Sequence, residues 1–405
     1  MTPDFIDMLK LFACGAVGIE YSGKNEINIE NIKRLAIEQS VWQTVFAGVN
    51  ASVKSGALKV DEKVFERLKL EVMASVRGSL MKNEYTYNVL SEVSGGLKYC
   101  VLKGKTVSRF YRYPDMRVSS DIDILIEQKD VDEWTKRLKK CGYSVEEPSD
   151  IVHHFGAVHP IGGLLEVHTE MYYKSTGDIL LKGLVNYDEP YEMCGGFPCL
   201  SVNDALVFLT AHLLKHFFVG AAGLRQICDL LVHMEHYKNE IDWEKYNGLM
   251  KTLGFTGFIS AIKGIGNKYF GFEFSDADEV GAEALLEDTE IGGNFGRKDS
   301  DAGKFYYSFL KNRSGMTEKQ FNAYYDKNSR GSAFSRMFPN LKAMERQYPS
   351  LEKCPCLLPI FWALRLGKIS VAVATRKRTV SNLPSDENES VKRRTELVKK
   401  LGMMK

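Results

Sequence analysis

The chain has 405 residues, more than the roughly 250 to 300 at which a single hydrophobic core stops growing, so we expect two or three packed units. Hydrophobic residues make up 44% of it and charged residues 26%, a composition that excludes an intrinsically disordered protein. The formal net charge of +2 removes the whole-molecule electrostatic argument for nucleic-acid binding and leaves only local basic patches to provide one.

Signals for secretion and membrane insertion are weak. The eight cysteines lack the Cys-x-x-Cys spacing of a structural zinc site, and acidic Asp4 and Asp7 stand where a signal peptide would carry lysine or arginine. The best candidate span, Leu357 to Thr375, is interrupted by Arg365 and Lys368. We therefore expect a cytoplasmic protein without a transmembrane segment.

The first quarter of the chain has the pattern of helices. Apolar residues recur at helical spacing from Ile29 to about Ala51 and from about Asp61 to Val93, and Gly95-Gly96 ends the pattern. Residues 1–95 are therefore predicted to form a helical N-terminal region.

Shorter elements of mixed type follow. A strand from Leu97 to Leu102 is bounded by Gly104, and a helical run to Tyr111 and a turn at Tyr113-Pro114-Asp115 come next. Alternating residues from Asp121 to Ile126 then predict a strand. Further predicted elements are a helix at Asp130–Cys141, strands at Tyr143–Val145 and Leu164–His168, and a hairpin at Tyr191–Leu200.

Helices are predicted to dominate again after this mixed region. Ser201 or Asn203 caps a long apolar helix through Phe217, a polar loop is expected from Gly292 to Gly331, and a charged tail from Val380 onward. The other predicted helices are Leu224–Tyr237, Trp243–Leu253 and Phe258–Tyr269. The fold class expected is α+β, a small mixed-sheet domain flanked by helical regions, with boundaries at 1–95, 96–200, 201–345 and 346–405.

Asp121 and Asp123 are the main candidates for chemistry. Two aspartates separated by one residue on a strand point to the same face, so both can serve one metal site. Mg²⁺ prefers such hard oxygen ligands and is commonly held by one or two carboxylates together with substrate phosphates. The intervening Ile122, Ile124 and Ile126 point to the opposite face and can anchor the strand in the core.

A third acid and several cations complete the predicted site. Glu166 lies on a later strand with His168 on the same face, and it could coordinate metal or accept a proton. Gly104 follows a strand and opens a helix, which would place backbone N–H groups near a phosphate. Lys103, Lys105 and Arg117 could neutralise phosphate charge, and Arg117 could alternatively pair with a carboxylate.

These motifs resemble a known family. The pieces are Leu102-Lys103-Gly104, Tyr113-Pro114-Asp115, Arg117, Asp121-Ile-Asp-Ile-Leu-Ile and Glu166-Val-His168, and more loosely His212-Leu-Leu-Lys-His216, Gly223-Leu-Arg225, Asp229, Tyr348-Pro349 and Leu358-Pro359. Together they are similar to the uncharacterised nucleotidyltransferases of the DNA polymerase beta-like superfamily.

The resemblance implies a nucleotidyltransferase domain and an enzymatic activity. A nucleoside monophosphate would pass from a nucleoside triphosphate to a hydroxyl acceptor, whether small molecule, protein or RNA, with release of pyrophosphate. Asp121, Asp123 and Glu166 would be catalytic residues and ligands of Mg²⁺ or Mn²⁺, and Lys103, Gly104, Lys105 and Arg117 would bind the nucleotide. The wider superfamily carries a Gly-Ser pair before the carboxylates, whereas Gly104 is followed here by Lys105, and Thr169 stands where the family tends to have an aromatic residue.

Two other functions fit the same residues. The altered Gly104-Lys105 pair agrees with an inactive nucleotide-binding or scaffold module, and His212 with His216, four apart on a helix, could support a metal-dependent phosphohydrolase. Alternatively, the histidines have a structural role: they face the α/β domain, and Arg225 and Asp229 form a polar pair on the next helix. The basic residues Arg376 to Arg378 and Lys392 to Arg394 are expected to be solvated.

Overall fold

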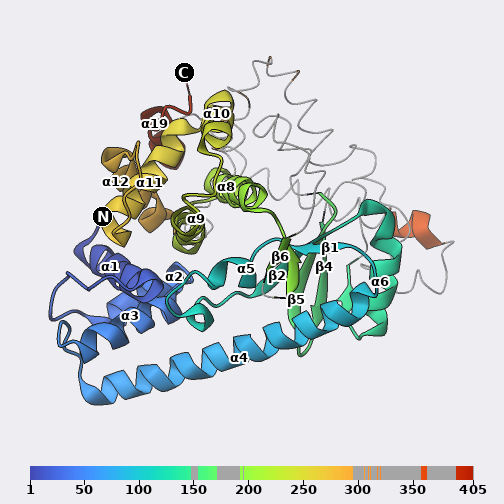
Figure 1. Cartoon of the computed structure of the whole chain (residues 1–405), viewed down its shortest axis with the longest axis horizontal. Coiled ribbons are helices and arrows are strands. Elements are labelled where there is room, and N and C mark those ends of the chain that lie inside the picture. Colours follow the sequence, from blue (N-terminus) through green and yellow to red (C-terminus); the bar gives the residue numbers. More distant parts are fainter. Residues whose placement is uncertain are drawn as a thin grey trace.

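A mixed β-sheet and two groups of helices make up the computed structural model (Figure 1). It describes residues 1–146, 154–170, 192–194, 196–294, 357–362 and 389–404, together with positions 305, 309, 311, 317 and 320. The predicted α+β class is confirmed. Over these residues, every helix is too short or too polar to cross a lipid bilayer.

The sheet has the strand order β3-β4-β5-β2-β1-β7-β6. Strand β2 pairs in parallel with β5, β1 pairs in parallel with β7, and the other pairs are antiparallel. The strands are β1 (Tyr99–Val101), β2 (Asp121–Ile126), β3 (Ser144–Val145), β4 (His154–His159), β5 (Gly163–His168), β6 (Glu192–Cys194) and β7 (Phe197–Cys199).

Strand β2 lies in the middle of this sheet, and its two faces contribute to two different hydrophobic core clusters. Its isoleucines are at most 3% exposed and belong to one core cluster with Trp134 and Leu138 of α6 (Val131–Lys140) and Leu90 of α4 (Glu62–Ser94). The predicted anchoring of Ile122, Ile124 and Ile126 is thus confirmed. Leu125, which shares a face with the two aspartates, belongs to the other core cluster, on the side of the helical region.

Four helices precede the sheet: α1 (Pro3–Val17), α2 (Ile29–Glu38), α3 (Trp42–Lys54) and α4, which runs along the border of the molecule in Figure 1. The helix predicted from Ile29 to Ala51 is broken at Gln39–Val41, where Ser40 adopts a positive φ of 55°. Helices α1 and α3 touch through their backbones, since a Cβ added to Gly48 would lie 1.9 Å from the Leu11 carbonyl oxygen. Only glycine allows this approach.

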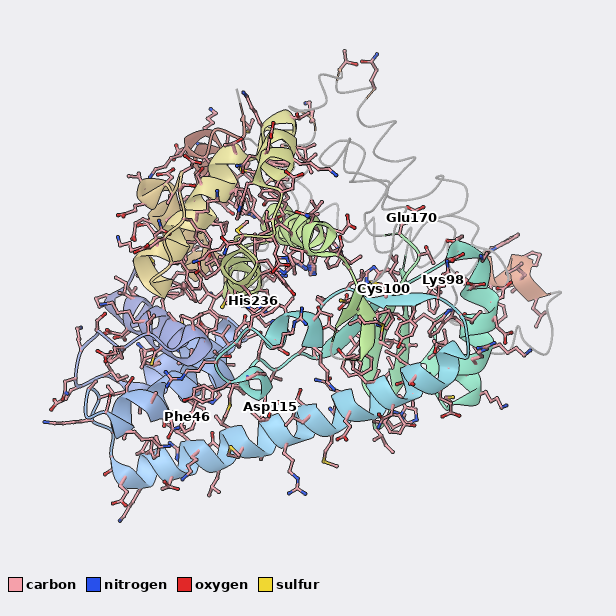
Figure 2. The ribbon with its side chains drawn as sticks, viewed as in Figure 1. Phe46, Lys98, Cys100, Asp115, Glu170 and His236 are labelled. Atoms are coloured by element: carbon pink, nitrogen blue, oxygen red, sulfur yellow. The ribbon has the colours of Figure 1, made fainter. Side chains whose placement is uncertain are left out.

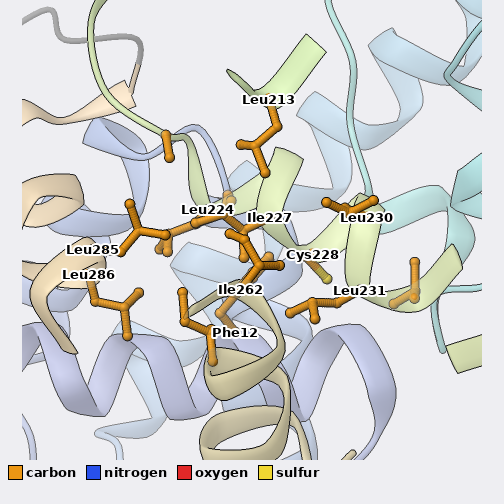
Figure 3. Packing of buried hydrophobic residues seen from close by; sticks show 14 of the residues in the cluster. Phe12, Leu213, Leu224, Ile227, Cys228, Leu230, Leu231, Ile262, Leu285 and Leu286 are labelled. Carbon is orange, nitrogen blue, oxygen red and sulfur yellow. The ribbon is translucent and has the colours of Figure 1, made fainter. Parts of the chain in front are cut away.

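The second group of helices packs against the first. Phe12 of α1 and Phe270 of α11 meet edge to face at 5.9 Å, and Figure 3 shows Phe12 among side chains of α9, α11 and α12. One hydrophobic cluster therefore joins the N-terminal and later helices. The later helices are α8 (Val202–Val219), α9 (Leu224–His236), α10 (Trp243–Leu253), α11 (Thr256–Phe270), α12 (Glu279–Gly292) and α19 (Glu389–Lys400).

Some local predictions are wrong. Helix α5 covers only Lys105–Ser108, not the whole run to Tyr111, because Phe110 and Tyr111 continue as turns. The basic group around Arg394 is not a solvated tail: α19 packs on α12, and Arg394 is fully buried. Most of the loop predicted at 292–331, the pair Tyr348-Pro349, and Arg376 to Arg378 lie outside the described residues.

Candidate active site

The two aspartates of β2 share a lysine. Strand β1 runs antiparallel to β2, so Lys103, just after β1, lies beside the start of β2. Its ammonium Nζ is 3.2 Å from Asp121 Oδ2 and 3.0 Å from Asp123 Oδ2. Burial alone would lower the pKa of Lys103, but Asp123 and Asp121 outweigh burial and raise it. Lys103 is therefore a cation held between two carboxylates.

Glu166 and His168 join Asp123 from the neighbouring strand. In the parallel register of β2 and β5, Asp123 lies opposite Glu166. His168 Nε2 donates to Asp123 Oδ1 at 3.1 Å and lies 3.8 Å from Glu166 Oε2. Ligand atoms of these three side chains all lie within 4.8 Å of one another, which is close enough to share one metal ion. Asp121 is not a member of this group. It is connected to the group by Lys103, whose ammonium lies near both Asp121 and Asp123.

Asp123 is the most deeply buried of the three acids, at 2% exposed. Burial raises its pKa, but the charge of Lys103 and the hydrogen bond from His168 outweigh burial, so the pKa of Asp123 lies below its usual range. Its Oδ2 atom is paired with the Lys103 ammonium at 3.0 Å, and no group in the described part of the chain donates a hydrogen bond of good geometry to it. This oxygen is therefore a cation-binding position, which the Lys103 ammonium contacts here.

Glu166 has the opposite electrostatic character. Burial, followed by the nearby charges of Asp123 and Asp121, raises the pKa of Glu166 above its usual value. A divalent cation would relieve the repulsion among the three carboxylates.

Two serines that sequence reasoning missed hold Asp121. Ser119 Oγ donates to Asp121 Oδ1 at 3.1 Å, and Ser120 Oγ lies 3.4 Å from the same oxygen. Both serines directly precede the strand, so the turn itself orients the first carboxylate. The Ser-Ser pair directly before Asp121 is the sequence feature that could have identified these two serines.

Helix α8 covers the carboxylate face of the sheet. His212 Nε2 lies 3.4 Å from Lys103 Nζ and 3.3 Å from His216 Nε2. Burial, then Lys103, lowers the pKa of His212 well below its usual value, and burial and Lys215 lower the pKa of His216 to about 3. Both histidines are thus neutral. The expectation that they face the α/β domain is confirmed, and in the described part of the chain neither belongs to a cluster of three metal-ligating side chains.

Lys215 of α8 is a second cation at this face. Burial lowers its pKa to about 8, while Glu166 and Asp123 favour its charged form. Positions 212, 215 and 216 share one helical face, so the spacing could have identified Lys215 from the sequence.

The turn at Gly104 and Lys105, where phosphate binding is expected, contacts two aromatic side chains. Helix α5 has four residues, and the Lys105 backbone N–H donates to the Tyr87 hydroxyl at 3.4 Å. The Lys105 ammonium lies over the rings of Tyr87 and Phe197, 4.5 and 5.5 Å from their centroids. Gly104 adopts φ +92°, which disfavours any residue with a Cβ.

Arg117 is engaged by a carboxylate, which was the alternative to its expected contact with phosphate. Its Nε donates to Asp229 Oδ1 at 2.8 Å, its Nη2 pairs with Oδ2, and the Tyr111 hydroxyl donates to Asp229 Oδ1 at 2.7 Å. Asp229 therefore pairs with Arg117 and not, as expected, with Arg225. Arg225 instead donates to the Val118 carbonyl oxygen at 2.8 Å. This network fixes the turn that leads into β2.

Asp115 lies outside the site. It is exposed in the short 3-10 helix η1 (Pro114–Met116), which contacts α4 (Figure 2).

Comparison with known families agrees with this geometry. The sequence matches the uncharacterised nucleotidyltransferase family over residues 25–271, more than half of the chain. The chain belongs to this family. The matched range contains β1, β2 and β5 and helix α8, and so every side chain of the carboxylate site. No curated protein and no solved structure matches it.

Proposed function

We propose that the protein transfers a nucleoside monophosphate from a nucleoside triphosphate to a hydroxyl acceptor and releases pyrophosphate. In this reaction the acceptor oxygen forms a bond to the α-phosphorus. The bond from that phosphorus to the bridging oxygen breaks, pyrophosphate keeps the electron pair, and the hydroxyl proton passes to a carboxylate of the site or to water. The observation that carries the proposal is the grouping of Asp121, Asp123 and Glu166 around Lys103 on one face of adjacent strands.

The donor set fits a divalent cation. Three carboxylates supply the hard oxygen ligands of Mg²⁺ or Mn²⁺, and the buried Asp123 Oδ2 already attracts a cation, the Lys103 ammonium. We assign Asp123 and Glu166, which lie close enough to share one ion, as ligands, and Asp121, which Lys103 holds beside them, as the third carboxylate ligand; His168 donates to Asp123 and orients it. When bound, the metal would supply Lewis-acid stabilisation of the charge on the attacking and leaving oxygens.

The protein's own groups orient the carboxylates and balance the charge. Ser119 and His168 each donate to one oxygen of an aspartate, which limits rotation of Asp121 and Asp123. Lys103 and Lys215 bring two ammonium groups to the carboxylate face, where they can pair with the phosphates of the nucleotide. They take over the role expected for Arg117 and for the Gly104 turn.

A product search tests the proposal. The protein is incubated with each nucleoside triphosphate and Mg²⁺, together with a cell extract, and both protein and small molecules are examined by mass spectrometry. We expect one species whose mass increases by one nucleoside monophosphate, accompanied by pyrophosphate. The same search with Asp123→Asn should give no such species, and an equal yield from that variant would exclude the proposed site.

The alternative, an inactive nucleotide-binding module, draws support from the Lys105 N–H, which is taken by Tyr87 and not offered to phosphate. That module would bind a triphosphate, measured by calorimetry, and produce no pyrophosphate with any acceptor. Both the active transferase and the inactive module predict weaker nucleotide binding in Lys103→Ala. Only the release of pyrophosphate distinguishes the two functions.

A further inference from the structure

A cavity of about 590 Å³ lies next to the carboxylate site and has no role in the mechanism above. Its volume is in the range of small-molecule sites. Helices α2, α3 and α4, the turn before β2 and the start of α9 contribute to its walls, with Lys33, Trp42, Ser75, Ser120, Arg225 and Asn294 among the lining residues.

The cavity reaches the catalytic carboxylates through Ser120. This residue lines the cavity, and its hydroxyl lies 3.4 Å from Asp121 Oδ1. Val118, two residues earlier in the same turn, also lines it. A molecule bound here is therefore one side chain away from a proposed metal ligand.

Arg225 gives the cavity a positive charge. Among the described residues its guanidinium makes one hydrogen bond, from Nη1 to the Val118 carbonyl oxygen, and no ion pair within 4 Å. The nearest acid on its own helix, Asp229, is already bound by Arg117 and Tyr111. The rest of the guanidinium is left to bind a planar anionic group.

The other walls combine polar and aromatic groups. The N-terminus of α3 lies beside Ser40 and Trp42, and none of the described side chains caps it. Asn294 is 5% exposed and donates from Nδ2 to Ser40 Oγ, so its position is fixed. Lys33 is paired with Glu71 and adds no net charge. The wall charge is thus +1, from Arg225.

We propose that this cavity binds the hydroxyl acceptor, a small polar molecule that carries a phosphate or carboxylate group. The anionic group contacts Arg225, and the hydroxyl points past Ser120 toward Asp121. The inference rests on the proposed function, because it names the substrate class of that reaction.

Calorimetry on the full chain without nucleotide tests it, using glycerol 3-phosphate, glycerate and glycerol as probes. We expect saturable binding of at least one anionic probe at up to millimolar concentration and none of glycerol. Arg225→Gln should weaken binding by at least about tenfold, since a charged hydrogen bond is lost. Arg109→Gln removes the same charge from an exposed site outside the cavity and should change affinity by less than about twofold.

A second pair of variants covers the case in which Arg225→Gln misfolds. Ser75 lines the cavity from the exposed side of α4, whereas its neighbour Ala74 is exposed and does not line it. Ser75→Trp should abolish probe binding, and Ala74→Trp should preserve it. Equal affinity in both tryptophan variants, or no saturable binding of either anionic probe, would overturn the inference. Binding without turnover would count against the proposed function alone, and turnover without probe binding against the acceptor site alone.

Discussion

Asp123 and Glu166 lie directly opposite each other on the neighbouring parallel strands β2 and β5. Adjacent strands are only about 4.8 Å apart, so two carboxylates in register on one face repel each other unless a cation lies between them. The Lys103 ammonium provides part of the compensation, His168 donates a hydrogen bond to Asp123, and a divalent metal would provide the rest. This relationship leads to the first prediction.

Replacing Lys103 with methionine should destabilise the metal-free protein. The substitution leaves two largely buried aspartates without their cation, which costs roughly 3 kcal/mol of unfolding free energy. Denaturant unfolding measures this, and added Mg²⁺ or Mn²⁺ should restore stability more in the variant than in the wild type. The control, Lys98→Met, removes an exposed lysine and should cost less than about 0.5 kcal/mol. A variant as stable as the wild type would show that Lys103 does not balance the acids.

The pair Arg117–Asp229 should be energetically coupled. Both side chains are at least 95% buried, so removing either partner leaves an uncompensated charge at a cost of about 3–5 kcal/mol. The double variant Arg117→Met with Asp229→Leu should lose much less than the sum of the single losses. A double-mutant cycle on the exposed pair Arg34–Glu38 should give less than about 1 kcal/mol. Additive losses at the buried pair would contradict the assignment.

His233 should make the protein less stable in acid. It is buried and hydrogen-bonded to the Val202 carbonyl oxygen, and burial lowers its pKa to about 4 from 6.5. The unfolded chain therefore binds the proton first, and the free energy of unfolding falls by up to roughly 3 kcal/mol as the pH drops from about 6.5 to 4. His233→Gln should flatten this slope in urea unfolding curves. An unchanged slope would assign the acid sensitivity to other groups.

Arg394 should hold the end of α8 in place. Its guanidinium donates to the carbonyl oxygens of Phe217 and Gly220 and lies 3.6 Å from Asp288. A cation at a helix C-terminus is favourable, and a buried one with three partners is costly to remove. Arg394→Gln should lower stability by about 2 kcal/mol or more and reduce transfer, because α8 carries His212 and Lys215. Lys392→Ala, at an exposed position of the same helix, is the control and should have little effect.

The sequence predicts those parts of the fold that depend on local periodicity. Helix α10 begins and ends at the predicted residues, and β2 has its aspartates and isoleucines on opposite faces. Strand β4 was missed because Gly156 and the flanking histidines give no strong alternation. Its formation depends on pairing with β3 and β5, which a single segment does not reveal.

The sequence predicted which residues form the candidate site better than it predicted the side chains that these residues contact. Glu166 and His168 were placed on one face by the period of a strand. Arg117 was assigned to phosphate because its partner, Asp229, is 112 residues away in the chain, and no local pattern marks that contact. Arg394 was expected to be solvated for the same reason: its acceptors, Phe217 and Gly220, lie at the C-terminal end of α8, far away in the sequence.

Magnesium-dependent pyrophosphate release from a nucleoside triphosphate tests the central claim most directly. The assay compares the wild type, Asp123→Asn and the matched control Asp132→Asn, an exposed aspartate on α6. We predict release in the wild type and the control and a loss of at least about a hundredfold in Asp123→Asn, with all three proteins folded by circular dichroism. Equal release from Asp123→Asn and the wild type would contradict the assignment of Asp123 to a metal-dependent transfer site.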